Sequence, residues 1–224
     1  TIDDLYDPYD IKDMEKIVDR IDVALKKHEK VCIYGDYDVD GITSITIMYK
    51  FLTKLGLDIM YYLPDRLVEG YGINNNALDE IKSQGVSLII TVDCGITAIE
   101  EIEYAKKIGL DVCITDHHEC TENLPDAYAI INPKRKDDNS KFKMLAGVGV
   151  AFKCLMAIAE KYNMALNESL WEHSDFSGEF NEKLNADRFL GFADVYEENR
   201  PAVPSKACDI IINYLEKAPE TVVD

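Results

Sequence analysis

The chain repeats one local pattern: a short apolar run, a turn, a helical stretch and a glycine. The apolar, β-prone runs are Val31–Tyr34, Leu57–Tyr62, Val86–Val92, Leu110–Thr115 and Ala127–Ile131. The helical stretches between them end at Gly56, Gly85 and Gly109, and glycine is a common helix terminator. Strands and helices that alternate in this way predict an α/β domain: a parallel sheet of about five strands with helices on both faces.

Further helices are predicted outside this repeat. Apolar residues recur at helical spacing from Ile11 to Leu25, and another helix is predicted from about Val150 to Tyr162. A mostly helical C-terminal segment is expected after it. The sequence therefore divides into an α/β domain at residues 1–162, an extension at 163–204 and a final helix at 205–224.

Composition narrows the class of protein. Hydrophobic residues make up 47% of the chain, which is enough for a packed core, but no apolar run approaches the roughly 20 residues of a membrane helix. We therefore expect no membrane contact. The six cysteines include no Cys-x-x-Cys pair, and Cys32 and Cys113 fall in predicted strands, so free thiols in a reducing cytoplasm are expected. The net charge of −18 disfavours broad binding to a polyanion, unless some of the carboxylates hold cations.

Acids and histidines gather directly after the predicted strands. In strand order they are Asp36, Asp38 and Asp40, then Asp65 and Arg66, then Asp93, and finally Asp116, His117 and His118. In an open parallel sheet, ligands bind outside the carboxyl ends of the strands. These side chains are therefore expected to converge on one rim of the sheet.

A rim of carboxylates and imidazoles can hold two divalent cations. Two cations that clamp a phosphoryl group are an effective arrangement for hydrolysing a phosphodiester. Mixed oxygen and imidazole ligation suits manganese, with magnesium or zinc as alternatives. Asp116 precedes the two adjacent histidines, so its carboxylate can orient one of them.

Some of these residues also have simpler explanations. The acids from Asp36 to Asp40 resemble a calcium loop, but the twelfth position of such a loop would be Ile47, where glutamate is required. Asp93 could instead cap a helix. Arg66 could grip a phosphate or pair with neighbouring acids.

The glycine-rich run around Gly147 and Gly149 opens a predicted helix. Glycines there could let a nucleic-acid backbone approach exposed N–H groups, or they could simply permit close helix packing. The sequence leaves both interpretations open.

Six segments together resemble the Asp-His-His (DHH) phosphoesterase superfamily, and within it the RecJ-type exonucleases. They are GDYDVDGITS from Gly35, LPDRLVEGYGIN from Leu63, VDCGI from Val92, TDHHE from Thr115, INPKR from Ile131 and LAGVGVAFK from Leu145. The match runs across roughly Val31–Ile158. The Leu-Pro-Asp-Arg and Ala-Gly-Val-Gly-Val segments narrow the resemblance to the RecJ branch.

The resemblance implies a role for each residue of the rim. The metal ligands would be Asp38, Asp40, Asp93 and His117, with Asp36 in support and His118 facing the scissile phosphate. A further metal-binding aspartate is expected in this family, and Asp194 occupies the matching place. The family also has a second, substrate-binding domain that this sequence does not contain, and the predicted helix at 205–217 would lead to it.

The implied activity is 5′-to-3′ hydrolysis of single-stranded DNA with two manganese ions. One alternative is a phosphodiesterase for short oligonucleotides or cyclic dinucleotides, which accommodates the net charge of −18 more easily. Another is a non-catalytic module of a replication assembly. The intact set of acids and histidines argues against that third possibility.

Overall fold

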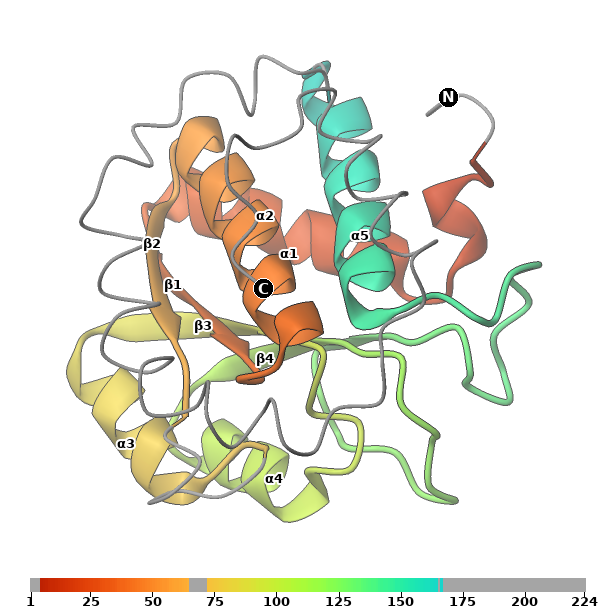
Figure 1. The fold of residues 1–224 in the computed structure, drawn as a ribbon. Helices are drawn as coiled ribbons and strands as arrows, with labels where there is room; N and C mark the ends of the chain where they lie inside the picture. The colour runs from red at the N-terminus through yellow and green to blue at the C-terminus, as the bar shows by residue number, and fades with distance from the viewer. Residues whose placement is uncertain (1–4, 65–71, 165, 167–224) are drawn as a thin grey trace, which may run out of the picture. The chain divides into compact units, whose positions relative to one another are not determined.

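Five parallel strands form a single sheet in the order β2-β1-β3-β4-β5 (Figure 1). The strands are β1 Lys30–Gly35, β2 Asp58–Tyr62, β3 Val86–Val92, β4 Asp111–Thr115 and β5 Ala129–Ile131. This computed structural model describes residues 5–64, 72–164 and 166. The described residues belong to one compact unit, Thr1–Leu170.

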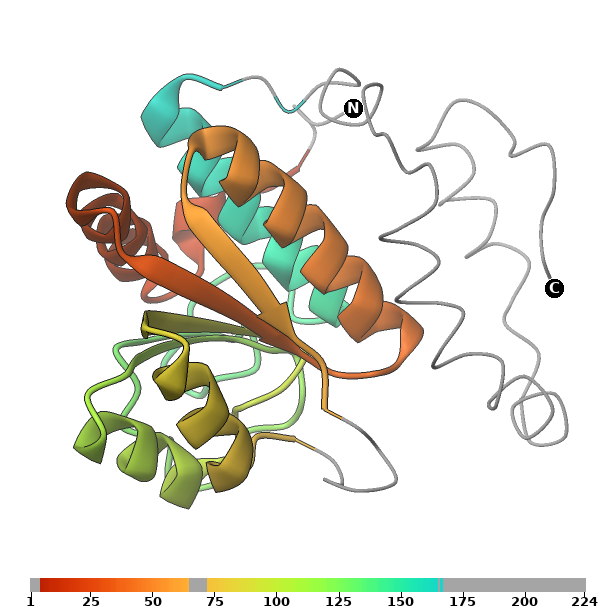
Figure 2. The ribbon, with the colours of Figure 1, turned by 90° about the vertical axis from the view of Figure 1, so that its left-hand side faces the viewer.

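Helices cover both faces of the sheet, as Figures 1 and 2 show. They are α1 Met14–Lys27, α2 Val39–Leu55, α3 Asn75–Ser83, α4 Ile99–Lys107 and α5 Gly147–Tyr162, with a short 3-10 helix at Pro8–Asp10. On one face, α5 packs against α1 and α2, while α3 and α4 contact each other on the opposite face. The predicted α/β class, with a parallel sheet and helices on both faces, is confirmed.

The sheet supplies the centre of both hydrophobic layers. In β1, Cys32 and Tyr34 are buried in the cluster that lies under α3 and α4. Val31 and Ile33 are also buried, and they point to the opposite face because side chains alternate along a strand. Burial on both faces explains why the strands read as continuous apolar runs in the sequence.

The helices α2 and α5 both begin ahead of their predicted starts. Asp38 accepts a hydrogen bond from the Gly41 N–H at 2.9 Å, so α2 starts at Val39, ahead of the apolar stretch from Ile42 that predicted it. Gly56 ends α2 at φ 100°, a left-handed conformation that glycine adopts without a steric penalty. Similarly, α5 begins at Gly147, three residues before the predicted start at Val150.

The predictions on the C-terminal segment and on membrane helices can be compared with the structure only over the described residues. The mostly helical C-terminal segment, with the divisions at 163–204 and 205–224, lies almost wholly outside the described residues. Within residues 5–64, 72–164 and 166, no helix combines the length and the apolar character that crossing a membrane requires.

Candidate metal centre

The direction of the strand order reverses between β1 and β3. These strands are neighbours, but β1 leads into α2 on one face whereas β3 leads into α4 on the other. At such a reversal the connections diverge, and ligands of α/β proteins bind in the gap outside the strand ends. Asp36 follows β1 there and Asp93 follows β3, so both carboxylates lie at the reversal point.

A tight turn after β1 holds Asp36 and Asp38. The buried Asp36 carboxylate accepts a hydrogen bond from the Tyr37 N–H at 2.7 Å, and Asp38 caps α2. Gly41 permits the turn, because a Cβ there would overlap the backbone carbonyl of Asp36. Asp36, Asp38 and Asp93 each offer a carboxylate oxygen, and these oxygens lie within 4.8 Å of one another.

Asp93 is the most constrained residue of the rim. Its backbone is left-handed at φ 58°, and its N–H donates to the Thr115 carbonyl at 3.0 Å. The residue is 1% exposed, and its Oδ1 atom makes no hydrogen bond. Burial, reinforced by the nearby charges of Asp40 and Asp38, raises the pKa of Asp93 to about 8. A buried carboxylate with an oxygen that accepts no hydrogen bond, in a strained conformation, is typical of a functional site.

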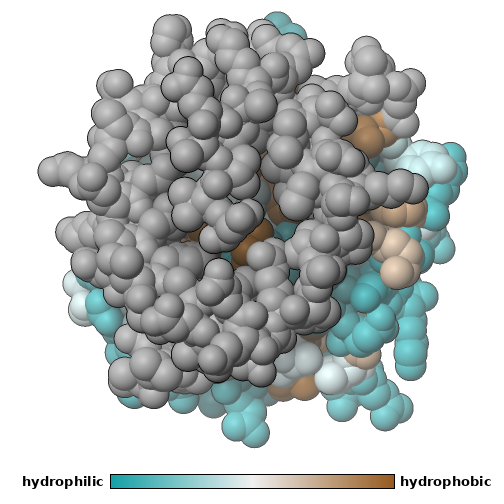
Figure 3. All heavy atoms as spheres, viewed as in Figure 1, coloured by the Kyte–Doolittle hydropathy of each residue, from teal (hydrophilic) through white to brown (hydrophobic). Residues whose placement is uncertain are grey.

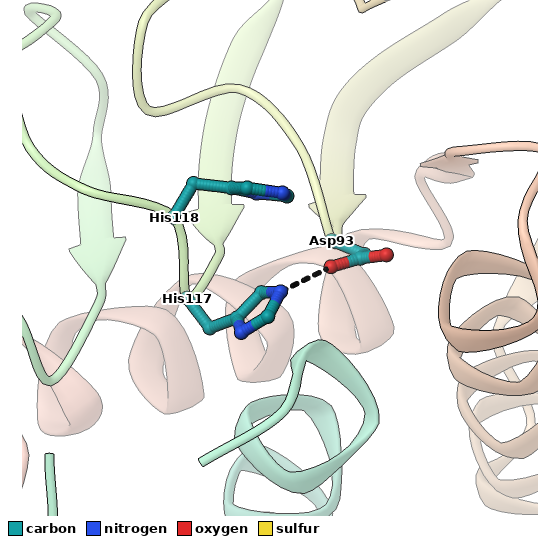
Figure 4. Close-up of side chains that lie close together, drawn as sticks. All are labelled: Asp93, His117 and His118. Carbon is teal, nitrogen blue, oxygen red and sulfur yellow. Dashed lines mark ion pairs between the residues drawn. The ribbon is translucent and has the colours of Figure 1, made fainter. Parts of the chain in front are cut away.

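His117 points its free ring nitrogen at Asp93. Its Nδ1 lies 3.1 Å from the Leu145 carbonyl, which can only accept, so Nδ1 carries the hydrogen of the neutral ring. The Nε2 lone pair then faces Asp93 Oδ1 at 3.1 Å (Figure 4). Asp40 Oδ2 lies 3.8 Å from the same nitrogen. Adjacent ligand atoms around an octahedral divalent cation such as magnesium lie about 3 Å apart. The separation of His117 Nε2 and Asp93 Oδ1 therefore fits two ligands of one divalent cation.

Asp116 fixes the neighbouring histidine. Its buried carboxylate accepts from the N–H groups of Ile96, His117 and His118, and from His118 Nδ1 at 2.7 Å. Burial alone would raise the pKa of Asp116, but the hydrogen bonds from His118 and Ile96 lower it. The same bond to Asp116 raises the pKa of His118. Asp116 thus orients His118, as the sequence predicted, and favours its protonated form.

Asp40 contacts α5, which the sequence did not indicate. Its Oδ2 accepts from the Gly147 N–H at 2.6 Å, and its Oδ1 accepts from the Val148 N–H at 2.7 Å. The N–H of Gly147 is therefore used within the protein, and a contact of this glycine with a nucleic-acid backbone stays a prediction. Both oxygens of Asp40 keep a second lone pair, so its predicted role as a metal ligand stays a prediction.

Gly147 lies against Asp93, where only a residue without a side chain fits. A Cβ at this position would overlap the carboxylate of Asp93, so the glycine allows α5 to touch the metal rim. At Gly149 a Cβ would instead meet the end of the Leu145 side chain at 3.2 Å. At Gly147 this close contact agrees with the packing interpretation of the glycine-rich run, and the role of Gly149 stays a prediction.

Gly147→Ala is expected to displace Asp93 and to lower manganese affinity by ~10-fold or more. Gly149→Ala is the matched control, because alanine favours the helix and the Leu145 side chain can rotate away. Calorimetric titration of both variants with manganese makes the comparison. Equal affinities in the two variants would show that Gly147 has no special place beside the centre.

The sequence-based prediction missed Asn132. This buried residue follows β5, and its side-chain amide donates to the His118 carbonyl at 3.0 Å while its oxygen accepts from the Lys134 N–H at 2.8 Å. Its position directly after the fifth strand was a signal that could have found it. Two other candidates, Arg66 and Asp194, lie outside the described residues.

The chain has recognisable relatives. Residues 30–173 match the sequence model of the DHH family, N-terminal domain. The single-stranded-DNA-specific exonuclease RecJ of Bacillus subtilis is 52% identical over 155 residues, which are 69% of this chain and 20% of that protein. RecJ of Escherichia coli is 39% identical over 146 residues, which are 65% of this chain and 25% of that protein. The chain thus spans a quarter or less of the length of these two relatives.

Solved structures show the same fold. The exonuclease RecJ bound to manganese superposes with a TM-score of 0.65 at 31% identity, covering 71% of this chain and 40% of that one. RecJ of Thermus thermophilus in complex with Mn²⁺ superposes with a TM-score of 0.60 at 27% identity, covering 71% and 22%. These likenesses confirm the resemblance to the RecJ branch that the six segments indicated. Because the family's sequence model matches well over half of its residues, this chain belongs to the DHH family.

Proposed function

We propose that this chain hydrolyses phosphodiester bonds in single-stranded DNA from the 5′ end, with two divalent cations, manganese in preference to magnesium. One observation carries the proposal: Asp93 belongs to both groups of potential ligands, one with Asp36 and Asp38 and the other with His117 and His118. A buried carboxylate shared by two groups is the arrangement that a bridging ligand needs. The likeness to manganese-bound RecJ supports the choice of metal.

Each side chain takes a distinct part in this proposal. Asp36, Asp38 and Asp93 would hold one cation, and Asp93 and His117 the other, with Asp40 and Asp194 completing the set. When bound, the two cations would supply a nucleophilic hydroxide and polarise the phosphoryl oxygens. The protein contributes the positions of the ligands, since the capped turn after β1 and the left-handed Asp93 hold the carboxylates before any substrate arrives.

His118 is assigned to the substrate in this scheme. Its Nδ1 is held by Asp116, its Nε2 side is assigned to a phosphate, and the raised pKa of the ring favours the cationic form. A cationic imidazole can stabilise the charge that develops on the phosphate, or give a proton to the leaving oxygen. Asp116 acts through His118 and does not contact the substrate.

Three further parts of the proposal concern the end of the strand, the cellular compartment and an alternative class of substrate. Arg66 is proposed to grip a terminal 5′-phosphate, for which a guanidinium fork is well suited. The buried thiols Cys32, Cys94, Cys113 and Cys154 are all unpaired, which supports action in the reducing cytoplasm. The net charge of −18 keeps a second candidate in view, a phosphodiesterase for short oligonucleotides or cyclic dinucleotides.

Release of mononucleotides from a 5′-phosphorylated single strand in manganese tests the proposal. The expected result is stepwise release from the 5′ end, with a slower rate in magnesium and none in a chelator. Hydrolysis of dinucleotides alone would support the second candidate. No hydrolysis of either substrate would indicate a non-catalytic module and overturn the proposal.

A further inference from the structure

The segment that joins β5 to α5, residues 132–146, begins and ends at the histidine pair. At its start, Asn132 donates to the carbonyl of His118. At its end, the Leu145 carbonyl lies 3.1 Å from Nδ1 of His117. Met144 and Phe142 come one and three residues before Leu145, so this end of the β5–α5 segment lies near the candidate metal centre.

Buried ionic contacts hold the β5–α5 segment in place. The Asp138 carboxylate is fully enclosed, and it accepts hydrogen bonds from the N–H groups of Lys12 and Ser140 and from Lys143 Nζ. Arg135 is also buried and donates to the Asp13 carboxylate and to the Ile130 carbonyl, both at 2.7 Å. The segment is thus fastened to the N-terminal part of the chain and to β5, and its exposed side chains project from a fixed backbone.

The exposed side chains of this segment are of two kinds. Phe142 is 47% exposed and Met144 is 75% exposed, so the fold leaves two large hydrophobic side chains at its surface here. Lys136 and Lys141 are exposed as well. Figure 3 shows a few brown and tan side chains among teal ones at the right-hand margin, the side on which Figure 1 places this segment.

The local charge of the segment is opposite to that of the chain. Residues 134–143 contain five cations and two acids, whereas the whole chain carries a net charge of −18. Lys134, Arg135 and Lys143 pair with acids, so the exposed positive charge of the segment comes from Lys136 and Lys141. An aromatic ring between lysines is the composition of surfaces that bind single-stranded nucleic acid, where bases stack on rings and phosphates meet cations. The exposed lysines therefore favour a polyanion, such as a nucleic-acid strand, as the ligand of this part of the surface.

We propose that Phe142, with Met144 beside it, is a stacking platform for a nucleobase of the strand at the metal centre, and that Lys141 contacts the phosphate backbone of that strand. The proposal rests on the proposed function, which it deepens by assigning a base-binding surface. It also explains how an acidic protein can act on a polyanion. The exposed lysines of this segment would attract the phosphates, next to the cations that complete the site. Because the backbone is held in place, little ordering is needed when the strand binds.

Comparing a normal strand with an abasic strand separates stacking from damage to the fold. The probes are a 5′-phosphorylated oligothymidylate and a strand of equal length without bases, each hydrolysed in manganese. Wild type is expected to prefer the normal strand by about 5- to 20-fold in kcat/KM. Phe142→Leu keeps an apolar side chain but loses the ring, so the preference should fall toward unity while the rate on the abasic strand stays unchanged. Phe142→Trp should retain the preference.

Tyr128→Leu is the matched control. Tyr128 is also 47% exposed, but it precedes β5 and so lies at the amino end of that strand, whereas the metal rim lies at the carboxyl ends. It should behave as wild type. Lys141→Ala should lower the rates on both strands alike and reduce their salt dependence. A preference that survives in Phe142→Leu would overturn the platform while leaving the proposed function standing. A wild-type chain that hydrolyses neither strand would overturn the proposed function, and the platform with it.

Discussion

Asp93→Asn is expected to abolish hydrolysis, with a loss of ~10³-fold or more in kcat, because the only carboxylate shared by both ligand groups of the described residues disappears. Asparagine has nearly the same shape, so the fold should persist. The measurement is the rate of mononucleotide release at saturating manganese. Asp126→Asn, which alters an exposed acid paired with Lys106, serves as the control and should retain full activity.

The same variant should be more stable than wild type when metal is absent and the pH is high. The pKa of Asp93 rises from 3.8 to about 8 on folding, so the folded state binds a proton more tightly than the unfolded state. Metal-free wild type therefore loses stability as the pH rises from about 4 to about 8, and asparagine escapes that loss. We expect the variant to gain roughly 2 kcal/mol in free energy of unfolding at pH 9, which is only part of the full linkage value.

Urea unfolding in a chelator at pH 5 and pH 9 measures the difference. At pH 5 Asp93 in the folded wild type is protonated and neutral, as asparagine is, so the two proteins should have similar free energies of unfolding. A stability difference that is the same at both pH values would mean that the gain does not come from the Asp93 charge. Wild-type activity in the variant would refute its assignment as a bridging ligand.

Substitution of the two adjacent histidines is expected to affect different steps, catalysis for His118 and metal binding for His117. His118→Ala should lower kcat by about 10²- to 10⁴-fold with little change in manganese affinity, because the ring faces the substrate and is held by Asp116. His117→Ala should weaken manganese binding by about 10- to 100-fold or more, because its Nε2 is directed at the cation position beside Asp93. Calorimetric titration and single-turnover rates separate the two effects.

The geometry makes this a sharp test, because ring nitrogens of both histidines lie within 4.8 Å of an Asp93 oxygen. An equal loss of manganese affinity in the two variants would make His118 a ligand and remove it from the substrate side. His28→Asn is a suitable control. It removes an exposed imidazole at the end of α1, where the left-handed backbone at φ 54° suits asparagine.

The rim is predictable from the sequence because it depends on a rule about sheets and not on individual contacts. All five strands are recognisable from their apolar runs, and residues that follow parallel strands must share one edge. This rule alone is enough to bring Asp36, Asp93 and the two histidines together. The glycines that end the helices mark the boundaries between the repeats.

The contacts that complete the centre cannot be predicted in the same way. Asp40 caps α5 from more than a hundred residues away, and no local pattern indicates which helix an acid will meet. The stretch that contains Arg135 and Asp138 has the sequence of an ordinary polar loop. Its ion pair and its hydrogen bond to the N-terminal part of the chain leave no periodic pattern in the sequence. Asp93 resembles a helix cap in the sequence, since a left-handed backbone is not visible there.

Anomalous diffraction from crystals soaked in manganese tests whether Asp93 bridges two cations. Two manganese peaks are expected at the carboxyl ends of β1 and β3, both within bonding distance of the Asp93 carboxylate, with His117 bound to one of them. In crystals of Asp93→Asn at the same manganese concentration, at least one peak should vanish. A single peak in wild type, or two peaks that do not share Asp93, would contradict the two-metal centre.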